Sequence, residues 1–179
     1  MSLVNDLHHK VYVATCESEG RKYGFVLTWV TPASLTRKDP KVILVVSRFN
    51  DSARALLRER RCCLHLLAES QLREFFIFGS RHSLREDKFK EFEWRPGSSG
   101  PVLGGCAGHG QVAIEEVFET PDRYVLYGTV AQESHGGEAP LILGPALERL
   151  GPLERKALEE KMAQDSLRDE KQFLTGGPS

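Results

Sequence analysis

The sequence predicts a mainly β protein: an antiparallel barrel with short helices at its mouths and one long helix after the strands. Three observations predict this class. About six segments are short, apolar and rich in β-branched or aromatic residues, as strands are. The helical patterns between them are brief, and strands and helices do not alternate as they do around a parallel sheet. At 179 residues, the chain is long enough for one domain with a sizeable core.

The first two predicted strands form a hairpin. Residues 11–15 and 23–30 are apolar, β-branched and aromatic, which is typical of strands. The polar segment 16–22 contains one glycine and is expected to be the loop of the hairpin. A second loop, with two prolines, is predicted over 31–40.

A buried strand followed by a helix is predicted next. The strand spans 41–47, and its centre, Val42–Val46, has no polar face. We therefore expect it to be buried on both sides. Asn50-Asp51-Ser52 is a strong helix-start signal, because these side chains accept hydrogen bonds from the first free backbone amides. The helix is expected over 53–58.

The middle of the chain mixes strands with helices and connections. The predicted elements are a strand over 62–67, a helix over 69–78 closed by Gly79-Ser80, a short charged piece over 88–92, a long glycine-rich connection over 96–110, and strands over 112–120 and 124–132.

The last predicted helix spans 152–173. Pro152 suits the first helical position, where its missing N–H has no partner to lose. The helix is densely charged except for a partial apolar stripe, which is expected to pack on the barrel or on a second subunit. The stripe consists of Leu153, Ala157, Leu158, Met162 and Leu167.

Composition limits the classes of partner. The chain has 24 Lys and Arg against 25 Asp and Glu, which argues against a general nucleic-acid partner. No apolar run reaches the length of a membrane span, so no membrane partner is expected. The four cysteines form no Cys-x-x-Cys, and the six histidines show no zinc-ligand spacing, so no metal site is expected. Reduced thiols indicate a cytoplasmic protein.

Two neighbouring segments indicate a site for a phosphate-bearing aromatic cofactor. Tyr23–Ser34 runs from an apolar strand into a small polar turn around Trp29. Ser47, Arg48 and Ser52 lie at a strand end and a helix start, where hydroxyl, guanidinium and amide donors can hold an anion together. The alternative is structural: a core tryptophan, a helix cap and a solvated arginine.

The order of short motifs between Val11 and Gln132 resembles the flavin reductase-like, FMN-binding split-barrel family. Each piece is common on its own, but eight in the same order and at similar spacing are far more specific. The pieces are Val26–Val30, Ser34-Leu35 with Pro40, Ser47-Arg48, Ser52, His65–Gln71, Asp87-Lys88-Phe89, Ser99–Leu103 and Asp122–Gly128.

The resemblance implies an antiparallel Greek-key split β-barrel over 11–150. A polar leader over 1–10 would precede it, and a helix over 151–175 would pack on the barrel or on the partner of a homodimer. The implied cofactor is FMN, or FAD, with NAD(P)H as co-substrate, and electrons would pass through the flavin to a flavin or another small-molecule acceptor. The cofactor-binding residues would be Thr28, Trp29, Val30, Thr31, Ser47, Arg48, Ser52, His65, Lys88 and Phe89.

Departures from the family pattern keep two other functions open. Arg123 stands where reductases of the family often carry a histidine near the nicotinamide, and the tail over 140–145 is altered. The chain could therefore be an electron carrier without nicotinamide turnover, or a non-catalytic interaction module. Val26 stands where many members have threonine, and His65 replaces an asparagine. A lone histidine in an apolar strand is more often a packed, hydrogen-bonded core group.

Overall fold

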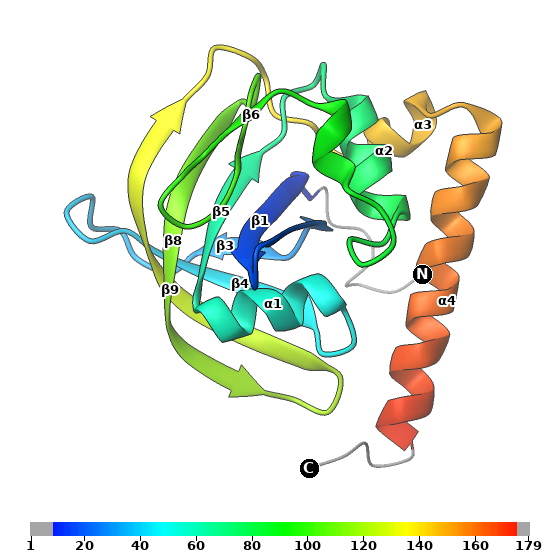
Figure 1. Cartoon of the computed structure of the whole chain (residues 1–179), viewed down its shortest axis with the longest axis horizontal. Helices are drawn as coiled ribbons and strands as arrows, with labels where there is room; N and C mark the ends of the chain where they lie inside the picture. Colours follow the sequence, from blue (N-terminus) through cyan, green and yellow to red (C-terminus); the bar gives the residue numbers. More distant parts are fainter. Residues whose placement is uncertain (1–8, 175–179) are drawn as a thin grey trace.

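A computed structural model describes residues 9–174 and contains a curled, seven-stranded antiparallel sheet, a half-barrel (Figure 1). Its strands are β1 (Tyr12–Ser18), β2 (Arg21–Leu27), β3 (Val30–Pro32), β4 (Lys41–Ser47), β5 (Arg61–Leu66), β8 (Gly108–Glu119) and β9 (Arg123–His135). They lie in the order β2-β1-β5-β8-β9-β4-β3, so β4 pairs with β9 rather than with β5. A separate pair is formed by β6 (Trp94–Arg95) and β7 (Val102–Leu103). The predicted mainly β, antiparallel barrel-like class is confirmed.

Helices cover parts of this sheet. They are α1 (Asp51–Glu59), α2 (Leu72–Ser80), the 3₁₀ helix η1 (Lys88–Glu91), α3 (Leu143–Arg149) and α4 (Pro152–Leu174). α4 runs along one side of the molecule, next to α2 (Figure 1). Most of the leader predicted over 1–10 lies outside the described residues, and the predicted division into leader, barrel and helix stays a prediction.

The β1–β2 hairpin is tighter than the sequence predicts. Its loop is only Glu19-Gly20, both with positive φ (52° and 72°), which is the geometry of a two-residue turn that follows the natural twist of the strands. The predicted loop over 16–22 is therefore wrong, because both strands continue through most of it. Glu17 pairs with Lys22 across the strands, so the polar residues of this segment are cross-strand neighbours.

Strand β4 has one buried face, not two. Val42, Leu44 and Val46 are buried in the core, whereas Ile43 and Val45 are partly exposed. The prediction of burial on both sides is thus wrong. β4 belongs to an antiparallel sheet with one face on the core, and on the other face even an apolar side chain can remain half-buried.

Helix α1 begins where the sequence predicts. Asn50 is its N-cap, and the side-chain oxygen of Asn50 accepts hydrogen bonds from the backbone N–H groups of Ser52 and Ala53. Ala53 and Leu56 are fully buried in the core inside the curl of the sheet. The cap therefore fixes the chain at the end of β4, which is the region predicted to hold a phosphate.

A second core lies between β1 and helices α2, α3 and α4. It contains Val13 from the strand, Phe75 and Phe78 from α2, and Leu158 from α4. α3 has no counterpart among the predicted elements, and α2 begins three residues later than its predicted start at 69. This core holds α2 and α4 against each other beside the sheet.

Helix α4 begins at Pro152, as predicted, but its apolar stripe is not buried as a unit. Of the five stripe residues only Leu158 is buried, and Leu153, Met162 and Leu167 are exposed. Instead, α4 is joined to the sheet by a buried polar contact. Asp169, only 6% exposed, accepts hydrogen bonds from Ser47 Oγ (3.2 Å) and Arg123 Nη1 (2.7 Å).

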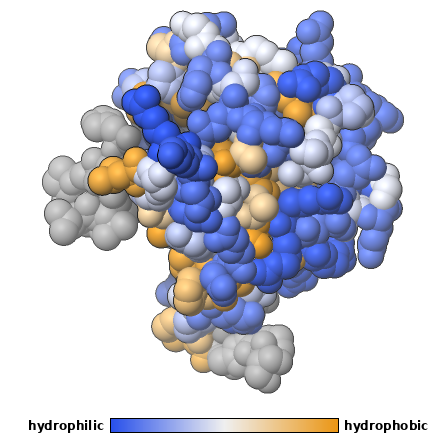
Figure 2. All heavy atoms as spheres, turned by 90° about the vertical axis from the view of Figure 1, so that its left-hand side faces the viewer, coloured by the Kyte–Doolittle hydropathy of each residue, from blue (hydrophilic) through white to orange (hydrophobic). Residues whose placement is uncertain are grey.

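The face of the molecule that lies on the left in Figure 1 is mainly hydrophilic. Figure 2 shows charged and polar side chains across most of it, with apolar residues between them. Phe118 of β8 is one exposed apolar residue of the chain. Isolated apolar residues of this kind are ordinary on a protein surface and do not by themselves indicate a binding site.

Candidate functional site

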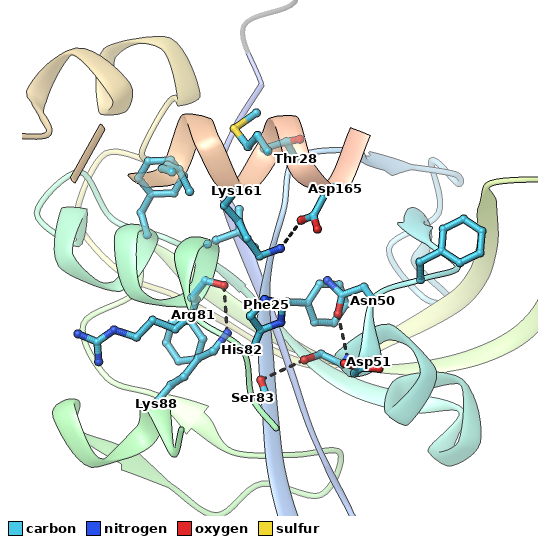
Figure 3. Close-up of a pocket in the computed structure, with 18 of the residues that line it drawn as sticks. Phe25, Thr28, Asn50, Asp51, Arg81, His82, Ser83, Lys88, Lys161 and Asp165 are labelled. Carbon is cyan, nitrogen blue, oxygen red and sulfur yellow. Dashed lines mark hydrogen bonds and ion pairs between the residues drawn. The ribbon is translucent and has the colours of Figure 1, made fainter. Parts of the chain in front are cut away.

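A cavity of about 240 Å³ lies between the start of α1, the end of α2 and helix α4 (Figure 3). Strand β2 forms its base through Phe25 and Val26. Residues 49–52, at the junction of β4 and α1, form a second wall, and Phe78 and Gly79 of α2 form a third together with residues 81–83, which follow the helix. Segments that are far apart in the sequence thus enclose one space.

Three of the ten predicted cofactor-binding residues line this cavity: Thr28, Ser52 and Lys88. Ser52 Oγ donates a hydrogen bond to Ser83 Oγ (3.0 Å), which in turn donates to the backbone oxygen of Gly24 (3.1 Å). These contacts order a pair of hydroxyl groups in the cavity wall (Figure 3). Ser83 was not predicted, because an isolated serine in a polar segment carries no sequence signal.

Ser47 and Arg48 lie next to the cavity but do not line it. Besides its bond to Asp169, Ser47 Oγ accepts one from the N–H of Phe49 (3.2 Å). Arg48 donates to the backbone oxygen of Thr120 (3.0 Å) and forms an ion pair with Glu119 (3.4 Å). Both predicted phosphate ligands are therefore engaged within the protein. Their role stays a prediction.

Trp29, Val30 and Thr31 lie on the edge of the sheet, outside the cavity. Trp29 is 43% exposed, so the alternative that it is a core tryptophan is wrong. The guanidinium carbon of Arg123 lies 5.4 Å from the centre of the Trp29 ring, a cation–π contact. Val30 and Thr31 pair with Leu44 and Ile43 of β4.

His65 and Phe89 are buried and do not line the cavity. Phe89 packs edge-on against Phe78, with ring centres 5.4 Å apart. His65 Nδ1 lies 3.0 Å from the backbone oxygen of Val13, and His65 Nε2 accepts a hydrogen bond from the N–H of Leu103 (3.0 Å). These partners make Nδ1 the protonated nitrogen. Burial lowers the pKa of His65 to about 4, so the ring is neutral at pH 7.

We expect His65 to make the protein sensitive to acid. Its pKa is lowered from 6.5 to about 4 in the folded state, so between these values the unfolded chain binds a proton that the folded chain does not. Stability present above about pH 6.5 is therefore lost as the pH falls, by on the order of 3 kcal/mol at pH 4. The free energies of unfolding of the wild type and of His65→Asn, measured by denaturant titration, should therefore approach each other by that amount as the pH falls from about 6.5 to 4. If the two free energies changed with pH in the same way, the lowered pKa of His65 would be contradicted. The variant His135→Asn is the control, because His135 is exposed.

Lys88 brings a buried ammonium group to the cavity. Only 3% of the residue is exposed, and its Nζ donates to the backbone oxygens of Gly24 (2.9 Å) and Phe78 (3.2 Å). Within the described chain, no carboxylate lies within 4.0 Å of this nitrogen. Burial, and then the charge of Lys161, lower the pKa of Lys88 to about 7. An anion in the cavity would stabilise its charged form.

Helix α4 closes the cavity with charged residues for which the sequence predicted no role. Lys161 and Asp165 form an ion pair that points into the space (Figure 3), and Arg168 Nη2 lies 3.2 Å from the other oxygen of Asp165. One carboxylate thus faces two cations. The spacing of charges along a helix cannot tell which face meets a cavity, and for this reason the sequence did not reveal these residues.

The lining suits a ligand with a flat aromatic part and an anionic end. Phenylalanine side chains provide apolar surface, while hydroxyl, imidazole and cationic groups provide hydrogen-bond donors. The start of α1 contributes less than predicted, because Asn50 already accepts from the amides of Ser52 and Ala53. The phenylalanines are Phe25, Phe49, Phe75 and Phe78, the other apolar residues are Val26, Leu143, Leu158 and Met162, and the donors include Thr28, Ser52, Arg81, His82, Ser83, Lys88, Lys161 and Arg168.

Comparison with known families agrees with this chemistry. Residues 4–144 match the model of the flavin reductase like domain. The chain belongs to this family. The predicted resemblance is confirmed, and helix α4 lies beyond the matched residues.

Two curated relatives have flavin-related functions. The chain is 30% identical over 134 residues to the reductase subunit HsaB of a flavin-dependent monooxygenase from Rhodococcus jostii, which covers 74% of this chain and 66% of that protein. It is 24% identical over 143 residues to a flavin reductase (NADH) from Kitasatospora aureofaciens, with 75% and 68% covered. The chain thus spans about two thirds of the length of each relative.

A solved structure supports the same fold. The crystal structure of nitrilotriacetate monooxygenase component B from Mycobacterium thermoresistibile matches with a TM-score of 0.70 and 25% identity, covering 84% of this chain and 87% of that one. Among the described helices of this flavin reductase-like chain, none is long and apolar enough to cross a membrane. The described residues also contain no group of three or more His, Cys, Asp or Glu side chains that could hold a metal ion.

Proposed function

We propose that this chain is a flavin reductase-like oxidoreductase that binds FMN, or FAD, in the cavity beside Lys88. It would pass electrons from a nicotinamide donor through the flavin to a flavin or another small-molecule acceptor. One observation carries the proposal: in a chain of this family, Thr28, Ser52 and Lys88 meet in one cavity with aromatic and cationic walls. The curated names of the relatives support flavin chemistry, and one of them specifies NADH.

The protein's own part is to bind and orient the cofactor. A bound flavin supplies the capacity to take up a hydride and release electrons. The apolar side chains of Phe25 and Phe78 would exclude water from its rings, and Ser52 and Lys88 would bind its polar end. Thr28, which lines the cavity, would lie along the edge of the ring system, as the family resemblance implies.

The carrier alternative is favoured by the surroundings of Arg123. In the family this position often carries a histidine near the nicotinamide. Here the guanidinium is paired with Asp169 (2.7 Å) and contacts the ring of Trp29, so its charge is already balanced. An anionic donor would gain little from it. A flavin-binding electron carrier without nicotinamide turnover is therefore the second candidate.

We also propose a cytoplasmic homodimer. Support for the compartment comes from the cysteines, all four of which are free, with Cys16, Cys62 and Cys63 buried. Support for the dimer comes from the family resemblance, in which two subunits share the flavin. Both are tested by the mass of the purified protein in solution and by its location in cells.

The first experiment is to record the visible absorption spectrum of the purified protein before and after adding FMN and removing the excess. Retained flavin bands in about a one-to-one ratio would support the cofactor assignment. Anaerobic NADH or NADPH is then added. Rapid bleaching of the flavin identifies a reductase, and retained colour identifies a carrier. A folded protein that retains no FMN or FAD and reduces neither would contradict the proposal and favour the interaction module.

A further inference from the structure

We propose that helix α4 completes the flavin site by supplying Lys161 and Arg168 as the cations that bind the phosphate end of the flavin nucleotide. This inference rests on the proposed flavin function. It concerns residues that lie beyond the part of the chain matched by the family model, which ends at residue 144.

The first support is the shortage of free donors where β4 meets α1, the region in which the phosphate was expected. Ser47 and Arg48, the expected phosphate ligands, are engaged with Asp169, Thr120 and Glu119. The first amides of α1 are taken by its own N-cap. A phosphate carries one to two negative charges and needs several donors at once. The loop between β4 and α1 therefore does not provide enough of them in this arrangement.

The second support is the unbalanced charge on the inner side of α4. Asp165 is shared by Lys161 and Arg168, so one carboxylate balances two cations. The Nε of Arg168 is buried and, among the described residues, has no hydrogen-bond acceptor. A buried donor without an acceptor is costly, and a ligand oxygen would satisfy it.

The third support is that these cations face the same space as Lys88 and His82. All four residues line the cavity, and burial, followed by the charge of Lys161, lowers the pKa of both Lys88 and His82. Two carboxylates, Asp51 and Asp165, also line it. Asp51 lies 3.9 Å from Arg54 and Asp165 is bound by the α4 cations, so each has a positive partner. A ligand anion would still find a surplus of positive charge.

The test compares the affinities of riboflavin, FMN and FAD, measured by flavin fluorescence titration. The variant is Lys161→Gln with Arg168→Gln. The matched control is Arg155→Gln with Lys156→Gln, which removes the same charge from α4 but where the side chains pair with Glu159 and Glu160 outside the cavity. We expect the test variant to bind FMN and FAD about tenfold or more weakly, with riboflavin within about twofold. The control should bind all three flavins like the wild type.

Other outcomes overturn the inference while leaving the flavin function intact. Unchanged FMN binding would show that α4 does not hold the phosphate, and equal weakening of FMN and riboflavin would give α4 a purely structural role. Weaker NADPH binding with unchanged FMN affinity would show that the two cations bind the nicotinamide donor instead of the flavin. If the wild type binds no flavin, the proposed function itself fails.

Two measurements guard against a variant that does not fold. The charge-conserving pair Lys161→Arg and Arg168→Lys should retain most of the FMN affinity. For the wild-type protein, raising the salt concentration should weaken FMN binding but not riboflavin binding, because salt screens the phosphate contact. If FMN binding to the wild-type protein did not depend on salt, the proposal would be contradicted, and this result needs no variant.

Discussion

The stability of the protein should rise as the pH is increased from about 7 to 10, because Lys88 is buried. The pKa of its ammonium group is about 7 in the folded state and 10.5 in the unfolded chain. Between these values the unfolded chain binds a proton that the folded chain has released, so raising the pH favours folding. The full gain from this group is on the order of 4 kcal/mol over the three pH units. Below pH 7 both states are protonated, and the cost of burying the charge is present in full.

The measurement is the free energy of unfolding of the wild type and of Lys88→Met across this pH range. Methionine fills a similar apolar volume but does not titrate, so the difference between the two proteins isolates the ammonium group. Lys90→Met is the matched control, since Lys90 is an exposed lysine of the same 3₁₀ helix. A difference that stays constant with pH would show that Lys88 is solvated in solution.

Replacing Phe78 by alanine should lower the free energy of unfolding by about 3–5 kcal/mol. Phe78 is 2% exposed and packs against Phe89 and Phe92, with ring centres 5.4 and 5.6 Å away. Removing the ring leaves a void that the surroundings can fill only in part. It also removes part of the cavity wall next to Lys88, so flavin binding should weaken together with stability.

Chemical denaturation of the purified variant checks this value, with Phe118→Ala as the control. Phe118 has the same side chain but is 60% exposed on β8, so its loss should change stability by less than about 0.5 kcal/mol. A small effect at Phe78 would mean that the second core packs less tightly than described. Phe78→Leu should recover much of the loss, since it restores most of the apolar volume.

Those parts of the fold that are determined by local sequence were predictable. The apolar run 41–47 forms β4, Asn50 caps α1, and Pro152 begins α4. Each of these signals depends only on residues that are close to one another in the sequence. The order of motifs also identified the family, because it samples the whole domain at once.

The errors arose where tertiary contacts decide. The segment 16–22 is polar, but cross-strand pairing and a two-residue turn make most of it strand. The centre of β4 is apolar throughout, yet its outer face remains half-buried. The stripe on α4 is apolar, but a polar contact through Asp169 joins the helix to the sheet. No residue pattern within these segments carries that information.

The candidate site was predictable only in part. Thr28 and Lys88 came from the family resemblance, Ser52 came also from the helix-start pattern, and the three meet in the cavity. Ser83 and the α4 cations were not predicted, because their importance depends on which surfaces lie opposite them. The predicted phosphate ligands Ser47 and Arg48 have other partners, and only the three-dimensional structure reveals those partners.

The wide sequence separation of the cavity walls affects the order in which the molecule assembles. Ser47 and Asp169, which hold α4 against the sheet, are 122 positions apart, whereas the β1–β2 hairpin closes through two residues. Closing a long loop costs more chain entropy than closing a short one, so such contacts form late in folding. During refolding, the β1–β2 hairpin should therefore be in place before the cavity can capture a ligand. Flavin capture would report completion of the native structure rather than formation of its strands.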